Sequence, residues 1–152
     1  MNSRFAVATH LLVYLAFTEG QPASSEVLAR SLGSHPVVVR RLVGALRKAG
    51  LVDTQLGAGG GARLARPVEG VTLLDVFEAM QEPEPDMFAL SNTNPSTHCG
   101  VGSVMRQTLE ELFAPAEEAM RQALATVTLS QVMQRVKAQV PASGGCLSHS
   151  AE

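Results

Sequence analysis

The feature that most constrains this chain is a pair of short helical segments joined by a turn of only a few residues. Ser24 is suited to cap the first segment, and Gly33 is suited to the left-handed position that follows a helix end. A second helix, over residues 36–49, opens with proline at a position where helices accept it, and Ser34 or His35 is its expected cap. Two helices this close in sequence predict a helix-turn-helix.

The second of these helices has an apolar face and, opposite to it, a face that carries positive charge. At about 100° per residue, the apolar positions fall together: Val39, Leu42, Val43, Leu46 and Ala49. The opposite face and its shoulder carry Val37, Arg40, Arg41, Gly44, Arg47 and Lys48. Arg pairs with guanine or phosphate, Gly allows close backbone approach and Val contacts a thymine methyl, so this face suits a major groove. A solvated face without a ligand is the plain alternative.

A glycine-rich segment follows, with four glycines in the five residues Gly57-Ala58-Gly59-Gly60-Gly61. Residues 51–56 and 62–66 on either side are compatible with strands, so the glycines predict a hairpin tip and also let the backbone approach a phosphate. A helix-turn-helix followed by a hairpin is a winged helix, with Arg63 and Arg66 placed to contact the DNA backbone or the minor groove. An enzymatic phosphate-binding loop is disfavoured, because there is no Walker pattern and no helix directly after the glycines.

The net charge of −2 hides an uneven distribution along the chain. Residues 1–70 hold eight Lys and Arg against four acids, whereas residues 71–152 hold four against ten. Between residues 30 and 66 the count is seven basic to one acidic. This asymmetry predicts a basic working surface in the first half and an acidic second half with a different task.

A long amphipathic helix is predicted in the acidic half, over residues 101–127. Its apolar positions recur at near-heptad spacing: Val101, Met105, Leu109, Leu112, Phe113, Ala116, Met120, Leu124 and Val127. Pro115 is expected to kink this helix or to divide it in two. Thr128 with Gln131 predicts a capped final helix. The stripe needs a partner, and a second copy suits it because a two-fold dimer presents two recognition helices to a palindromic site.

The remaining segments indicate a mainly α, cytoplasmic protein. Residues 4–18 are apolar almost all round and predict a buried helix, and Thr72 with Asp75 predicts a short helix that stops at Pro83. No apolar run approaches the roughly 20 residues that a membrane span needs, and no cleavage site follows the apolar N-terminus. Two cysteines cannot build a disulfide framework and fit a cytoplasmic chain.

Three motifs carry a resemblance to a known family: R-K-A-G-L-V at 47–52, L-G-A-G-G-G-A-R-L-A-R-P at 56–67 and V-T-L-L-D-V-F-E-A at 71–79. In this order they resemble the Rrf-two family of bacterial winged helix-turn-helix transcriptional regulators, relatives of IscR, NsrR and CymR, over residues 3–138. The resemblance implies that the helix at 36–49 and the wing at 56–66 read DNA. It also implies that the helix at 101–127 forms a homodimer.

Iron–sulfur members of this family hold their cluster with three cysteines in the loop before the dimerisation helix, whereas this loop contains only Cys99. We therefore expect no cluster and no other cofactor. The segment N-P-S-T-H-C-G-V-G-S at 94–103 is similar to the cluster-free, YwnA-like branch. The family often has Arg at the position of Leu56, and its loss shifts the expected minor-groove contact toward Arg63.

Cys99 follows His98 and precedes the start of the long helix, and both an imidazolium and a helix N-terminus stabilise a thiolate. The pattern predicts a redox or electrophile sensor whose oxidation alters the dimer and releases DNA; the alternative is a small, buried, inert cysteine packed at the interface. A cysteine hydrolase is disfavoured because adjacent side chains rarely face each other and no orienting group is evident. Cys146 and His149 lie on a Gly- and Ser-rich tail that is a poor platform for a metal.

The sequence thus predicts a winged helix-turn-helix domain over 1–81, an effector or sensor loop over 82–100, dimerisation helices over 101–140 and a flexible tail over 141–152. It predicts a regulator without enzymatic activity, a homodimeric repressor on a palindromic operator that answers to a small molecule or an oxidant. A module that docks a partner enzyme through the acidic residues 82–86 is the alternative. The residues expected to contact DNA are Ser34, His35, Val37, Arg40, Arg41, Gly44, Lys48, Gly59, Gly60, Arg63 and Arg66. The residues expected to form the dimer are Met105, Leu109, Leu112, Phe113, Met120 and Leu124.

Overall fold

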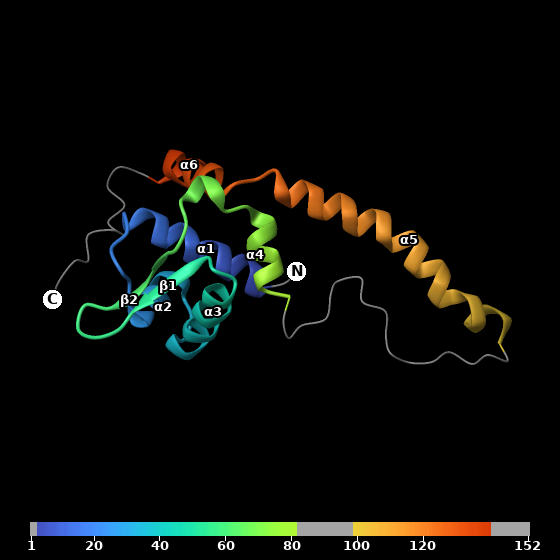
Figure 1. Ribbon diagram of the computed structural model, residues 1–152, viewed down its shortest axis with the longest axis horizontal. Helices are drawn as coiled ribbons and strands as arrows, with labels where there is room; N and C mark the ends of the chain where they lie inside the picture. The colour runs from blue at the N-terminus through green and yellow to red at the C-terminus, as the bar shows by residue number, and fades with distance from the viewer. Residues whose placement is uncertain (1–2, 82–98, 141–152) are drawn as a thin grey trace.

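The computed structural model describes residues 3–81 and 99–140. Its elements are, in chain order, α1 (Ser3–Phe17), α2 (Ser25–Leu32), α3 (Pro36–Lys48), β1 (Val52–Gln55), β2 (Gly61–Leu64), the 3₁₀ helix η1 (Val68–Gly70), α4 (Leu73–Ala79), α5 (Gly100–Ala125) and α6 (Leu129–Gln139). Figure 1 shows α1 to α4, the hairpin and α6 gathered into one body, from which α5 extends as a long arm. This arrangement confirms the predicted mainly α fold with a small hairpin wing and a long C-terminal helix.

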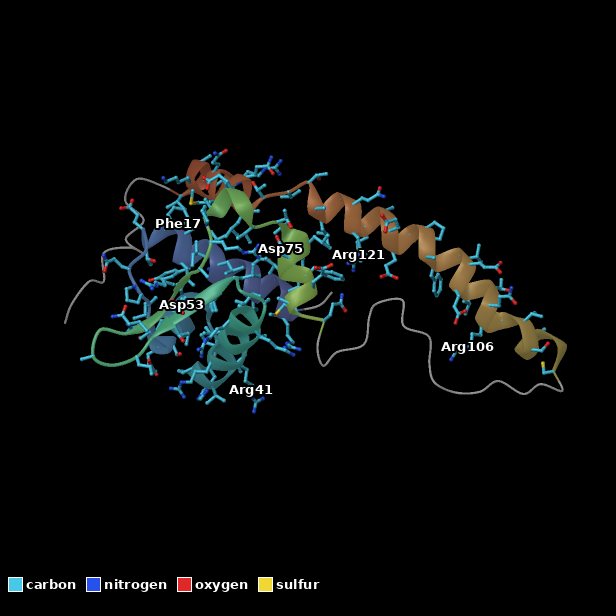
Figure 2. The ribbon with its side chains drawn as sticks, in the orientation of Figure 1. Phe17, Arg41, Asp53, Asp75, Arg106 and Arg121 are labelled. Atoms are coloured by element: carbon cyan, nitrogen blue, oxygen red, sulfur yellow. The ribbon has the colours of Figure 1, made fainter. Side chains whose placement is uncertain are left out.

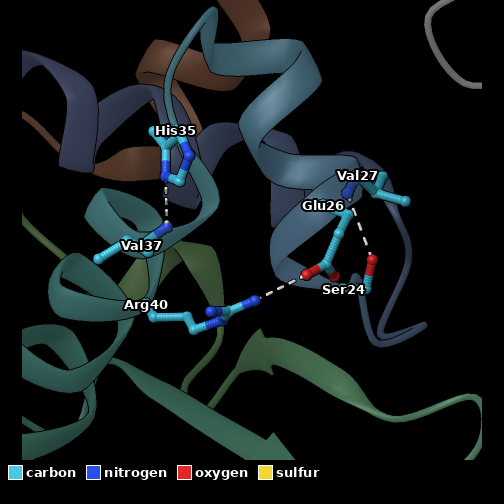
Figure 3. Close-up of polar contacts among 6 residues, drawn as sticks. All are labelled: Ser24, Glu26, Val27, His35, Val37 and Arg40. Carbon is cyan, nitrogen blue, oxygen red and sulfur yellow. Dashed lines mark hydrogen bonds and ion pairs between the residues drawn. The ribbon is translucent and has the colours of Figure 1, made fainter.

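Caps define the start of α2, its end and the start of α3 (Figure 3). Ser24 Oγ accepts a hydrogen bond, at 3.3 Å, from a backbone N–H in the first turn of α2. Gly33 ends α2 in the left-handed region, with φ at 56°. His35 Nδ1 accepts a hydrogen bond from the N–H of Val37 at 3.3 Å, so His35 rather than Ser34 is the N-cap of α3. These local interactions produce the predicted helix-turn-helix.

β1 and β2 form the antiparallel hairpin of the wing, with Val52 opposite Leu64. Ala62 of β2 also pairs with Ala23, through N–O distances of 2.8 and 2.9 Å, and this bridge ties the wing to the segment before α2. The bridge leaves no room for a side chain beside it, because a Cβ added at Gly61 would lie 2.3 Å from the Ala23 carbonyl oxygen. Gly61 is therefore required by the fold itself.

The hydrophobic core forms where α1 meets α2, α3, α4 and α6. Its largest fully buried side chains are Leu11, Leu12, Leu15, Leu28, Val39, Leu46, Leu51, Val52, Val71, Val76, Met80 and Leu129. The predicted apolar face of α3 is buried except for Ala49, which is exposed because α3 ends at Lys48 and helical periodicity stops there. Burial of each large aliphatic side chain stabilises the fold by roughly 1.5–3 kcal/mol. This burial sets which side of α3 faces outward.

Two backbone hydrogen bonds fasten the junction between α5 and α6 to the segment before α4. The N–H of Leu73 donates to the Val127 carbonyl at 2.9 Å, and the N–H of Leu129 donates to the Val71 carbonyl at 2.8 Å. Both predicted capping boxes are present, at the starts of α4 and α6. With Leu129 fully buried, α6 packs against α1.

α5 is one helix of 26 residues with Pro115 in its interior, so the predicted alternative of two helices is wrong. Proline leaves one carbonyl without an N–H donor, and because no residue of α5 is buried, water can reach that carbonyl. α5 meets the rest of the fold at its C-terminal end, where Arg121 forms an ion pair with Glu78 of α4. Within residues 3–81 and 99–140, no helix has the length and apolar character needed to cross a membrane.

Two glycines allow a matched test of this packing. Gly61→Ala is expected to lower the free energy of unfolding by roughly 1–3 kcal/mol, because the new methyl meets a backbone carbonyl. Gly44→Ala is expected to raise it by up to about 1 kcal/mol, because alanine favours a helix interior and a Cβ at Gly44 meets nothing within 4 Å. Urea unfolding measures both, and equal stability of the two variants would contradict the assigned register of the wing.

Candidate nucleic-acid interface

The outward face of α3 presents cationic, small and apolar side chains together. Arg41, Gly44 and Lys48 are exposed on it, and Val37 is 43% exposed. Figure 2 shows Arg41 projecting from the outer edge of the body, away from the core. Arg41 makes no side-chain hydrogen bond or ion pair with any residue that the structure describes. The predicted face thus contains a guanidinium that is available to a ligand.

Arg40, on the shoulder of α3, forms an ion pair with Glu26 of α2 (Figure 3). Its Nη2 lies 2.9 Å from Glu26 Oε1, and both side chains are more than half exposed. The pKa of the Glu26 carboxyl lies below its ordinary value, mainly because the carboxyl accepts a hydrogen bond from the backbone N–H of Glu26 itself. A hydrogen bond from Arg40 is the second cause. The pair joins the two helices of the helix-turn-helix. Because exposed pairs of this kind are weak, a DNA phosphate can replace the carboxylate as the partner of Arg40.

Arg63 forms a second ion pair, across the wing. Asp53 and Arg63 are opposite each other in the register of β1 and β2, and Arg63 Nη2 lies 3.1 Å from Asp53 Oδ2. Hydrogen bonds from Arg63 and then from the N–H of Thr54 lower the pKa of the Asp53 carboxyl. The ion pair thus holds Arg63 on an exposed side of the wing. The sequence predicts that Arg63 contacts the DNA backbone or the minor groove.

Arg66 and Lys48 lie together at the other end of α3. They line a polar groove of about 450 Å³ between α3 and α4, with Asp75 and Glu78 on its α4 side. Arg66 Nη2 lies 3.9 Å from Asp75 Oδ1. The structure therefore brings Arg40, Arg41 and Lys48 onto one helix, with Arg63 and Arg66 on and beside the wing.

Sequence reasoning missed two apolar side chains of this surface. Val38 is 45% exposed beside Val37, and Leu56, where β1 leads into the wing turn, is 93% exposed. The only sequence signal for Val38 and Leu56 is an apolar residue type at the start of a predicted helix and at the end of a predicted strand. Gly59, a predicted DNA contact, is exposed in the wing turn, whereas Gly60 is half-buried and a Cβ there would lie 2.3 Å from the Gln55 carbonyl oxygen. The hairpin itself thus requires a glycine at this position.

The apolar stripe of α5 is largely open to solvent. Val101, Val104, Met105 and Leu112 are between 41% and 65% exposed. The other four predicted dimer residues are half-buried: Leu109, Phe113, Met120 and Leu124. Burial of this stripe therefore requires a partner beyond the described residues.

Cys99 is an exposed, free thiol directly before α5. The backbone N–H groups of Gly102 and then Val101, in the first turn of α5, lower the pKa of this thiol. The predicted sensor partner His98 lies outside the described residues, as do the acidic segment 82–86 and the Cys146 and His149 pair. Cys99 is not buried by the described residues of its own chain, and the alternative of an inert cysteine packed at the dimer interface stays a prediction.

Comparison with known proteins agrees with this geometry. A family model, Rrf2, described as an iron-dependent transcriptional regulator, matches residues 1–135. The chain is 38% identical over 133 residues to YwnA of Bacillus subtilis (strain 168), assigned as an HTH-type transcriptional regulator, and the match covers 88% of this chain and 96% of that protein. The chain therefore belongs to the Rrf2 family of DNA-binding transcriptional regulators, as its motifs predict.

Two solved structures share the fold. CymR, the global cysteine regulator of B. subtilis, superposes with a TM-score of 0.65 at 22% identity, over 89% of this chain and 96% of that one. IscR of T. potens gives a TM-score of 0.64 at 23% identity, over 93% of this chain and 91% of that one. This likeness confirms the winged helix arrangement with its long C-terminal helix.

The iron in the family description raises the question of a metal site. The sequence contains two cysteines, and Cys99 is the only one in the loop before α5. Among the residues that the structure describes, no three His, Cys, Asp or Glu side chains are grouped to hold a metal ion. A cluster held by three cysteines of that loop does not fit this donor set. The function proposed below uses no iron.

The ion pair between Glu26 and Arg40 predicts a pH dependence of stability. Because folding lowers the pKa of Glu26, the stabilisation is present above its ordinary value of 4.5 and is lost as the pH falls through the lower folded value. Glu26→Gln is expected to lower the melting temperature slightly near neutral pH, and the difference from wild type is expected to disappear at low pH. Thermal unfolding across an acidic pH series measures this difference.

Glu69→Gln is the matched control for this series. Glu69 is exposed in η1 and forms no ion pair with a described residue. Its variant is expected to follow the wild type at every pH. A Glu26→Gln variant that also follows the wild type throughout would show that the ion pair contributes nothing to stability.

Proposed function

We propose that this chain reads DNA sequence-specifically as a homodimer, with α3 in the major groove and the β1–β2 wing beside it. The observation that carries the proposal is the outward face of α3, where Arg41, which has no side-chain partner among the described residues, stands with Gly44 and Val37 on a helix whose other face is buried in the core. Membership of the Rrf2 family supports DNA as the ligand. The proposal assigns residues 1–81 to DNA binding and residues 101–140 to dimerisation.

The side chains of α3 suit different parts of a base pair. Arg41 can pair with O6 and N7 of a guanine, and Val37 can contact a thymine methyl. Gly44 lets the helix backbone approach the groove closely, since nothing lies within 4 Å of its position. Ser34 and His35 precede the first turn of α3, where helix N–H groups favour a phosphate.

The remaining arginines suit the phosphate backbone. Arg40, Arg63 and Arg66 are each exposed and within 4 Å of a single carboxylate that a phosphate can replace. Lys48 adds charge at the far end of α3, and Gly59 and Gly60 bring the wing turn close to the DNA. Such contacts release counterions, so the logarithm of the affinity falls linearly with the logarithm of the salt concentration.

The stripe of α5 supports the homodimer. Eight apolar side chains of α5 are exposed or half-buried along one helix, and two copies of that helix can cover one another around a two-fold axis. The backbone hydrogen bonds at the junction of α5 and α6, with the ion pair between Arg121 and Glu78, join α5 to the body, so pairing of two arms would also set the distance between the two copies of α3. A dimer of this kind fits a palindromic operator, and we take its bound state to be the repressing one.

Cys99 supports a response to oxidants. The thiol is exposed, its pKa is lowered, and it lies where α5 begins, so an oxidant can reach it and change the dimer arm. Peroxide converts a thiolate to a sulfenic acid with release of hydroxide. A second thiol can convert the sulfenic acid to a disulfide with release of water, and reduction of that disulfide restores the thiol. In this proposal the oxidised dimer releases its operator.

Arg41→Ala is expected to reduce operator affinity by roughly 1–3 kcal/mol, which is a loss of about 5- to 150-fold, because a base contact is removed. Fluorescence anisotropy with a duplex from the chain's own promoter measures the affinity at fixed salt. Arg135→Ala, which removes an equally exposed arginine from α6, is the control and is expected to bind as the wild type does. Equal losses in both variants would contradict the assignment of α3.

Leu112→Glu is expected to weaken self-association by about 100-fold or more, because a symmetric interface would bury two new carboxylates. Leu112 is 65% exposed, so the change should leave the fold of the single chain intact. Ala114→Glu places the same charge on the opposite, exposed side of α5 and is expected to preserve the dimer. Sedimentation equilibrium measures both, and a dimeric Leu112→Glu protein would show that the stripe is not the interface.

Peroxide is expected to abolish operator binding by the wild type and by Cys146→Ser, but not by Cys99→Ser. The reason is that oxidation at the start of α5 acts on the dimer arm, whereas Cys146 is far from α5 in sequence and outside the described residues. Operator binding before and after a graded peroxide treatment, followed by reduction with a thiol, gives the readout. Equal sensitivity of wild type and Cys99→Ser would remove Cys99 from the mechanism.

A further inference from the structure

A groove of about 510 Å³ lies along the seam between α1 and α6 and is unused by the function proposed above. One wall is a face of α1 that includes Tyr14 and Phe17, and the other consists of three valines at or after α6, Val132, Val136 and Val140. Figure 2 shows Phe17 at the end of α1, beneath α6. Ser31, in the last turns of α2, closes the groove on a third side. Three helices thus enclose a hollow of the size that small-molecule sites have.

The lining of the groove specifies the chemistry of an occupant. Among the described residues no Lys, Arg, Asp or Glu lines it, and the walls are mostly aliphatic and aromatic. Four lining side chains carry hydrogen-bonding groups: Thr9 Oγ1 donates to the Phe5 carbonyl, whereas His10, Tyr14 and Ser31 have no side-chain partner in the described part of the chain. A largely apolar site with a few hydrogen-bonding groups and without charge selects an uncharged organic molecule over a phosphate or a charged peptide.

The position of the groove connects the two parts of the proposed regulator. Ser31 belongs to α2, which is joined to the recognition helix α3 by the Glu26 and Arg40 ion pair. α6 follows directly on α5, and the bond from Leu73 N–H to the Val127 carbonyl holds their junction against the body. An occupant can therefore contact α2 of the helix-turn-helix through Ser31 and also α6, which follows the dimer arm. The exposed stripe of α5 points to a second copy on the arm, whereas the groove is lined by residues of α1, of α2 and at or after α6, and these helices lie in the body from which α5 extends (Figure 1).

We propose that this groove is an effector site for a small, uncharged, ring-containing organic molecule, and that its binding changes the affinity of α3 for DNA. The ring contacts Phe17 and the valines of α6, and a polar substituent hydrogen-bonds to Tyr14, His10 or Ser31. A molecule that fits the groove at only one separation of α1 and α6 stabilises the conformation with that separation over conformations with a different one, as an allosteric effector must. The expected change in DNA affinity rests on the proposed function, whereas binding of the small molecule in the groove does not.

Nile red, an uncharged ring-containing dye with a carbonyl acceptor, tests the binding step on the full-length protein. Saturable fluorescence enhancement is expected with the wild type, and Val136→Phe, which fills the groove, is expected to bind about tenfold more weakly or worse. Lys137→Phe adds the same ring at the neighbouring exposed position of α6 and is expected to bind as the wild type does. Circular dichroism confirms that both variants fold. No saturable binding, or equal binding by Val136→Phe, would overturn the site.

Sedimentation of Val136→Phe separates a ligand site from a contact between copies. An unchanged oligomeric state is expected, and a loss of self-association would overturn the proposal by showing that a second copy covers the groove. Operator affinity with and without saturating Nile red then tests the coupling, with a change of about fivefold or more expected in the wild type and none in Val136→Phe. Operator binding that ignores the bound dye would overturn the effector role. Failure to bind any operator would refute the proposed function and leave the dye result standing.

Discussion

Burial of one face of α3 in the hydrophobic core is the interaction on which the rest of the structure depends. Val39 and Leu46 are fully buried in this core, and their positions on the helix leave Arg41 and Gly44 on the opposite side. The hydrophobic effect that stabilises the domain therefore also chooses which side chains meet a ligand. His35 caps α3 and thereby sets where the helix begins, whereas the buried residues set which side of the helix faces outward.

The second half of the chain follows a different constraint. The backbone pairing of Val71 with Leu129 returns the chain to the body after α5, and α6 completes the core there. α5 contacts the body near Arg121 and Glu78, and none of its residues is buried by the part of the chain that the structure describes. An arm whose apolar stripe the described residues leave open suits a protein that works as a pair.

Local signals made much of this fold predictable from the sequence. Ser24, Gly33, Thr72 and Thr128 each act on backbone groups within a few residues, and all four cap or end a helix as predicted. The outward face of α3 was likewise predictable, because helical periodicity alone separates its two sides. Ala49 was wrongly assigned to the buried face because periodicity does not tell where a helix ends.

Interactions between distant segments were not predictable. The ion pair of Arg40 with Glu26 and the bridge of Ala23 with Ala62 depend on how α2 is placed against α3 and the wing. The glycine-rich segment predicts a hairpin tip whose backbone can approach a phosphate, but for the same reason it does not reveal that Gly61 is needed to admit the Ala23 carbonyl. The groove between α1 and α6 left no motif at all, since its walls come from ordinary core-type residues of three helices.

The central claim is that a two-fold dimer presents two copies of α3 to DNA, and selection of bound duplexes from a random-sequence pool tests it most directly. The account predicts enrichment of a palindrome whose half-sites are centred about one helical turn apart, roughly 34 Å, or a multiple of that distance. Each half-site should be altered when Arg41 is replaced. No enrichment over the starting pool, or enrichment of a single half-site without symmetry, would contradict the account.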